Sequence, residues 1–99
     1  MVSMASEREP LTFAAFVISL ATTAAIHFGD LPDPAGGEAE VNLEGAAQII
    51  DVLELFEEKS RGNLTAEERQ LIEQVLYELR LRFVQAQQSA PGGKRIILP

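Results

Sequence analysis

The stretch "EEKSRGNLTAEE", residues 57–68, separates two segments whose apolar residues recur at helical spacing. Arg61 is a cation of the kind that suits the last turn of a helix, and Gly62 can adopt the left-handed conformation that follows one. Thr65 and Glu68 have the spacing of a capping box, in which each residue satisfies a backbone N–H of the other. These signals predict a hinge between two helices, an αα-hairpin, and not a catalytic or binding loop.

The predicted hinge has five structural residues: Gly62, Asn63, Leu64, Thr65 and Glu68. Leu64 is the apolar residue of this turn, and we expect it to close the end of the hydrophobic core.

Two helices are expected on either side of the hinge, at about residues 43–61 and 66–88. The apolar stripe of the first is Ala46, Ile49, Ile50, Leu53 and Phe56. The main stripe of the second is Ile72, Val75, Leu76, Leu79, Phe83 and Ala86. A further apolar row on the second helix, Tyr77, Leu81 and Val84, indicates more apolar surface than one neighbouring helix can cover. Glu78 and Arg82 have the spacing of an ion pair within this helix.

Upstream, residues 11–29 contain no charged side chain and predict a helix at about residues 11–28. Either Pro10 occupies its first turn or Thr12 caps it, and Gly29 ends it. Residues 30–41 are rich in Pro, Gly and acids, which is typical of a mobile loop. The expected organisation is thus one helical domain over 11–88, with a flexible N-terminus over 1–10.

Residues 89–99, "SAPGGKRIILP", form a basic and apolar tail after the last predicted helix. We expect a flexible end. The alternative is that its "RIIL" segment docks on a partner in an extended conformation.

The composition excludes several kinds of chemistry. The chain of 99 residues has no cysteine, which rules out disulfides, thiolate zinc sites and cysteine nucleophiles, and fits a cytoplasmic protein. Its net charge of −7 argues against a nucleic-acid partner. The single histidine, His27, has no second ligand nearby, so we expect no metal, and a packed or capping role instead. The acids Asp51, Glu54 and Glu58 share one helix face, but the Glu-x-x-His pairs of di-iron bundles are missing. We therefore expect neither an enzyme nor a cofactor.

Three passages resemble a bacterial family of small helical proteins catalogued as domain of unknown function 1844. They are "FAAFVISLATTAAIHFGD" (residues 13–30), "NLEGAAQIIDVLELFEEKSRGNLTAEE" (residues 42–68) and "LYELRLRFV" (residues 76–84). The most specific part is E-K-x-x-G-N-L-T, from Glu58 to Thr65; Ser60 stands where the family often has Thr. The resemblance implies an all-helical cytoplasmic protein and brings no activity, cofactor or catalytic residue.

The uncharged segment 11–29 leaves three functions open. The first is a membrane-associated protein in which this segment enters the bilayer. The segment barely reaches the 20 or so residues that a membrane span needs, and its Ser, Thr, His and Ala residues lower its hydrophobicity. It could instead be buried in a protein oligomer. A third possibility is a carrier of a small apolar ligand, with a cavity lined by Phe13, Phe16, Phe28 and Phe56.

We favour burial in an oligomer. The predicted fold is all-α, a three-helix protein with a C-terminal αα-hairpin, assembled as a homo-oligomer, with a two-fold dimer favoured. The first helix is expected at or near the seam between copies. The predicted interface residues are Phe13, Phe16, Val17, Leu20, Ala24, Tyr77, Leu81 and Val84. The predicted function is a non-catalytic interaction module that binds itself and, through the loop 30–41 or the tail, a protein partner.

Overall fold

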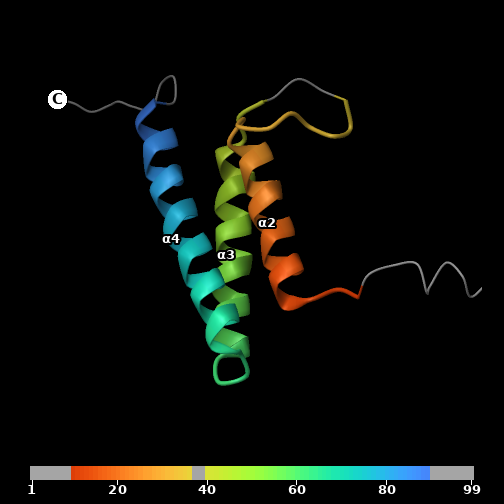
Figure 1. Cartoon of the computed structure of the whole chain (residues 1–99). Helices are drawn as coiled ribbons and strands as arrows, with labels where there is room; N and C mark the ends of the chain where they lie inside the picture. The colour runs from red at the N-terminus through yellow and green to blue at the C-terminus, as the bar shows by residue number, and fades with distance from the viewer. Residues whose placement is uncertain (1–9, 37–39, 90–99) are drawn as a thin grey trace, which may run out of the picture.

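The computed structural model describes residues 10–36 and 40–89, and all the regular structure in these ranges is helical. The helices are α2 (Phe13–His27), α3 (Leu43–Ser60) and α4 (Ala66–Ser89). Each helix contacts both of the others, so they form a three-helix bundle. Figure 1 shows the long α2–α3 connection at one end of the bundle and the short α3–α4 turn at the other. The predicted all-α fold with a C-terminal hairpin is therefore confirmed.

Helix α2 is bounded by two residues that were predicted at its ends, Thr12 and Gly29. The Thr12 hydroxyl accepts a hydrogen bond from the Ala15 N–H at 3.0 Å, so Thr12, and not Pro10, provides the N-terminal cap. At the other end Gly29 has φ +83°, and its N–H donates to the Ile26 carbonyl at 3.0 Å. The Asp30 N–H donates to the Ala25 carbonyl at 2.9 Å, which completes a Schellman motif.

The α3–α4 turn has the left-handed glycine and the capping hydrogen bonds that were predicted for the hinge. Gly62 has φ +90°, a left-handed conformation that glycine adopts without strain. The Thr65 N–H donates to Glu68 Oε1 at 2.9 Å, and the Glu68 N–H donates to Thr65 Oγ1 at 3.1 Å. The capping box is thus formed in both directions. Leu64 is partly buried against the core, and the Asn63 N–H donates to the Ser60 carbonyl at 2.9 Å.

The hydrophobic core lies between the three helices and contains residues from each. Its buried members are Val17, Ala24, Phe28, Ala46, Ile50, Leu53, Ile72, Leu76, Leu79 and Ala86. The predicted stripes of α3 and α4 supply most of them, and Ile49, Phe56, Val75 and Phe83 are partly buried beside them. The helical periodicity therefore predicted the inward faces correctly.

Arg82 ties α4 to the end of α2. Its Nε and Nη2 atoms donate to the two carboxylate oxygens of Asp30 at 2.8 and 2.7 Å, and its guanidinium carbon lies 5.2 Å from the centre of the Phe28 ring. The predicted Glu78–Arg82 pair is wrong, because Arg82 bonds to Asp30 instead, and Glu78 accepts a hydrogen bond from Gln74. The bidentate contact lowers the pKa of Asp30 below its usual value.

The remaining predictions about flexible segments concern residues that the structure describes only in part. Residues 1–9, 37–39 and 90–99 lie outside the described ranges. Within the predicted loop 30–41, Asp33 forms a tight turn by accepting from the Ala35 N–H at 2.9 Å.

Candidate interaction surface

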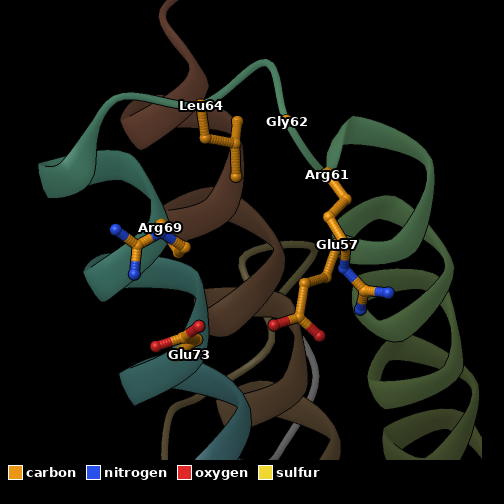
Figure 2. A pocket seen from close by; sticks show the side chains of 6 residues that line it. All are labelled: Glu57, Arg61, Gly62, Leu64, Arg69 and Glu73. Carbon is orange, nitrogen blue, oxygen red and sulfur yellow. The ribbon is translucent and has the colours of Figure 1, made fainter.

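A small pocket lies beside the α3–α4 turn. Its volume is about 180 Å³, and it is lined by Glu57, Arg61, Gly62, Leu64, Arg69 and Glu73. Figure 2 shows Glu57 and Arg61 on the α3 wall and Arg69 and Glu73 on the α4 wall, so each wall has one arginine and one glutamate. Opposite charges four residues apart lie next to each other on a helix. The pocket therefore has little net charge with which to attract an ionic ligand.

The residues predicted to form the hinge all lie at this turn. Gly62 reverses the chain, Leu64 packs on the core, and Thr65 and Glu68 cap α4. Asn63 is exposed and contributes its backbone N–H to the turn. The turn is thus better described as a structural element than as a binding site.

The described residues contain no group of three or more His, Cys, Asp or Glu side chains that could hold a metal ion. His27, the single histidine, is half-buried at the end of α2. A Cβ atom at Gly45 would lie 2.8 Å from its ring, so the imidazole packs closely on the first turn of α3. This contact places His27 in a packing role between two helices.

Two of the predicted interface residues lie in the monomer core. Val17 and Ala24 have no exposed surface, because α3 and α4 together cover the inner face of α2. These two residues cannot contact a second copy in this fold, and their assignment to the interface is corrected. Phe13 and Leu20 pack on the same core, and Phe13 stacks on Phe56 with ring centres 5.1 Å apart.

The exposed face of α2 is uncharged but only weakly apolar. Ala15, Ile18, Ser19 and Thr22 are exposed along it. The Thr22 hydroxyl donates to the Ile18 carbonyl at 3.0 Å, and the Thr23 hydroxyl donates to the Ser19 carbonyl at 3.1 Å. The two threonine hydroxyls thus donate within the helix.

Helix α4 has an exposed apolar row on the side that faces away from the core. Tyr77 is 65% exposed, and Leu81 and Val84 are each 47% exposed. We define the outer stripe of α4 as the exposed residues that continue this row: Gln70, Gln74, Tyr77, Leu81, Val84 and Gln88. They alternate at spacings of four and three residues, which is the pattern of a helix–helix seam, and none is charged. This stripe resembles an interface more than any part of α2 does.

A shallow groove between α3 and α4 adjoins the outer stripe. Its volume is about 280 Å³, and it is lined by Ala47, Ile50, Asp51, Arg80, Phe83 and Val84. Arg80 is held at its edge by Glu54, with an Nη2–Oε2 distance of 2.8 Å. Val84 belongs to both the groove and the outer stripe, so the two apolar surfaces are continuous. We call this feature the α3–α4 groove.

The sequence did not predict this groove, although it predicted several of its residues individually. Ile50 and Phe83 were expected on the apolar stripes, and Asp51 on an acidic helix face. In an antiparallel hairpin, equal distances from the α3–α4 turn would place residues 47–51 opposite about residues 75–79, whereas the groove joins them to residues 80–84. The position of the hinge alone therefore did not predict this pairing, which depends on how the helices and their side chains pack.

The four phenylalanines of the predicted apolar-ligand cavity do not share one site. Phe13 and Phe16 both pack on Phe56, with ring centres 5.1 and 5.0 Å apart. Phe28 lies at the other end of α2 and contacts Phe83, with ring centres 6.5 Å apart. The cavity prediction is therefore wrong, because these rings fill space against one another.

The structure does not support the alternative of a membrane-spanning helix. Among the described residues, no helix combines the length and the apolar character needed to cross a bilayer. The uncharged segment 11–29 supplies α2, which has only 15 residues.

Comparison with known proteins agrees with the resemblance seen in the sequence. The family described as Domain of unknown function (DUF1844) matches residues 10–85. The chain belongs to the DUF1844 family. The match covers α2, α3, the hairpin turn and most of α4, including Tyr77, Leu81 and Val84, and it ends before residues 90–99. No curated protein and no solved structure matches the chain significantly. Membership of DUF1844 thus leaves the function to be argued from the surface.

Proposed function

We propose that this DUF1844 chain is a non-catalytic helical module that pairs with a second copy of itself through the outer stripe of α4. The observation that carries the proposal is the exposure of Tyr77, Leu81 and Val84 in one row without a charged residue among them. No other helix of the described bundle covers this row, whereas the inner face of α4 is buried against α2 and α3. Exposed apolar rows of this kind mark protein interaction sites.

The charge distribution favours self-association through this stripe. The chain has a net charge of −7, so two copies repel each other over most of their surfaces. The outer stripe carries only amide and apolar side chains, and the nearby Arg80 is held by Glu54 of the same chain. Two copies can therefore approach along α4 with the least electrostatic cost.

The size of the surface is compatible with a small two-fold dimer. Two helices of the length of α4 packed along their faces would bury on the order of 1,000 Å² in total, which is the lower range for specific interfaces. Half-exposed Tyr, Leu and Val side chains would contribute about 1 kcal/mol each on full burial, before the cost of association. We expect a reversible dimer with an isologous interface, in which each copy presents the same stripe.

The other parts of the proposal rest on composition. The chain offers no cysteine and a single histidine that packs on Gly45, which supports a protein without catalytic activity or cofactor. The lack of cysteine also supports a cytoplasmic location, and the negative charge supports protein partners over nucleic acids.

The proposal is tested with two variants that add the same charge to different helices. Leu81 on α4 is 47% exposed and Leu55 on α3 is 55% exposed, so neither substitution disturbs the core. We expect Leu81→Glu to weaken dimerisation by more than tenfold, because a glutamate at the centre of the seam must lose its water, and Leu55→Glu to leave it unchanged. Sedimentation equilibrium measures both dissociation constants, and circular dichroism confirms that both variants remain helical. Equal dissociation constants for the two variants would contradict the proposal.

A further inference from the structure

The tail of the chain has the chemistry to occupy the α3–α4 groove. Residues 90–99 read "APGGKRIILP", with two cations, Lys94 and Arg95, directly before three aliphatic residues. The groove presents apolar side chains from Ile50, Phe83 and Val84. We propose that residues 94–98 of the same chain dock in the α3–α4 groove, with the aliphatic side chains on its floor and the cations toward the start of α3. This inference goes beyond the proposed self-association, which uses the outer stripe and shares only Val84 with the groove.

The position of the groove suits a segment that follows α4 directly. Helix α4 ends at Ser89, at the same end of the bundle at which α3 begins (Figure 1). Along α4, Val84 lies roughly 8 Å and Arg80 roughly 14 Å back from Ser89, at 1.5 Å per residue. The eight residues from Ala90 to Ile97 span up to about 26 Å. The tail is therefore long enough to reverse its direction and return along the groove.

The sequence between α4 and the docking segment allows this reversal. Pro91 cannot continue a helix, and Gly92 and Gly93 follow it directly. Two adjacent glycines accept the backbone conformations of a tight turn at no steric cost. A reversal at this point would direct Lys94 and the residues after it along α4 toward Val84.

The charges of the tail complement those near the groove. Acidic residues outnumber basic ones 15 to 8 in the chain, and Lys94 and Arg95 are two of the eight. Asp51 and Arg80 line the groove, but Arg80 is already paired with Glu54, and Glu44 is exposed in the first turn of α3. The last turn of α4 contains no basic residue of its own, so the negative end of its dipole is uncompensated. Two cations just beyond it would lie near all three sources of negative potential.

The chain's lack of cysteine makes a disulfide test clean. The test variant carries Ala47→Cys in the groove and Ile97→Cys in the tail. The matched control carries Thr22→Cys, on the exposed face of α2, with the same Ile97→Cys. Both variants are oxidised at low protein concentration under equal conditions. Non-reducing electrophoresis and mass spectrometry separate bonds within one chain from bonds between chains, and circular dichroism checks the fold.

We expect the Ala47→Cys variant to form an intramolecular disulfide at least tenfold faster than the control. Adding Asp51→Lys should slow this reaction several-fold, because the reversed charge repels Lys94 and Arg95. Equal rates in the test variant and the control would overturn the inference, since they would show a tail without a preferred site. Predominant bonds between two chains would also overturn it, because the tail would then dock on another copy. Dimerisation is measured separately by sedimentation of Leu81→Glu, because Leu81 does not line the groove.

Discussion

The inner face of α4 and the centre of its outer face both carry apolar side chains at helical spacing, yet they differ in what covers them. The inner residues Ile72, Leu76 and Leu79 are buried against α2 and α3. The outer residues Tyr77, Leu81 and Val84 are about half exposed or more. A helix in a three-helix bundle meets only two neighbours, so one apolar face is covered and a second one remains outside. The difference shows which apolar residues fold the chain and which are left for a partner.

The largest expected effect comes from exchanging leucine for alanine on the two faces. Leu76 is 1% exposed, and Leu76→Ala should lower the free energy of unfolding by about 3 kcal/mol through the lost contacts and the cavity. Leu81→Ala should change it by less than about 0.5 kcal/mol in the monomer. Urea unfolding at a protein concentration well below the dimer dissociation constant measures both values, since association would add apparent stability. Similar losses for both variants would break the distinction between the two faces.

The second expected effect concerns the turn that determines which face of α4 is directed inward. Gly62 has φ +90°, and nothing lies within 4 Å of a Cβ atom added there. A substitution at Gly62 is therefore opposed by backbone strain and not by a clash. Gly62→Val should cost about 2 kcal/mol of unfolding free energy, because a β-branched residue strongly disfavours the left-handed region.

Gly45→Ala is the contrasting case, because its cost arises from contact. A Cβ atom there would lie 2.8 Å from both the His27 ring and Asn42 Nδ2, and Gly45 is helical. The double variant Gly45→Ala with His27→Ala should recover part of the stability that Gly45→Ala loses, whereas His27→Ala should not rescue Gly62→Val. Thermal unfolding distinguishes the two cases. A fully stable Gly62→Val variant would show that the turn does not need a left-handed residue.

The smallest expected effect comes from the ion pair that joins α4 to the end of α2. Arg82 lowers the pKa of Asp30 through its hydrogen bonds and its charge. A lowered folded-state pKa contributes stability above the unfolded value of 3.8, and this contribution is lost as the pH falls through the folded-state pKa. Because the pair is partly exposed to solvent, Asp30→Asn should cost only about 0.5 kcal/mol at pH 7. The cost should shrink toward zero in strong acid.

The control for this measurement is Glu58→Gln, because Glu58 is exposed and belongs to neither of the two ion pairs found among the described residues. Urea unfolding at several pH values compares the two variants with the unchanged chain. A difference between Asp30→Asn and the unchanged chain that stays constant down to strong acid would contradict the role of Arg82.

Local signals in the sequence predicted most of the fold. Thr12, Gly29, Gly62 and the Thr65–Glu68 capping box act through contacts within a few residues, so their chemistry can be read without knowledge of the tertiary structure. The inward stripes of α3 and α4 follow from periodicity alone. These features determine where the helices begin and end and which residues they bury.

The candidate site was less predictable because it depends on distant contacts. Val17 and Ala24 were placed at an interface because α2 is apolar over much of its circumference, which does not reveal which side its neighbours cover. Arg82 was paired with Glu78, four residues away, although its actual partner Asp30 is 52 residues away. By contrast, Tyr77, Leu81 and Val84 were predicted as a second apolar row, and the structure leaves that row exposed.

The mass of the unmodified chain in solution tests the central claim most directly. The chain has a mass of 10.8 kDa, and light scattering after size-exclusion chromatography reports the mass of the assembled species. If two copies pair through the outer stripe of α4, the mass should rise with concentration toward twice 10.8 kDa and level off there. A mass that stays at 10.8 kDa up to millimolar concentration would show that the exposed row of α4 does not bring two copies together.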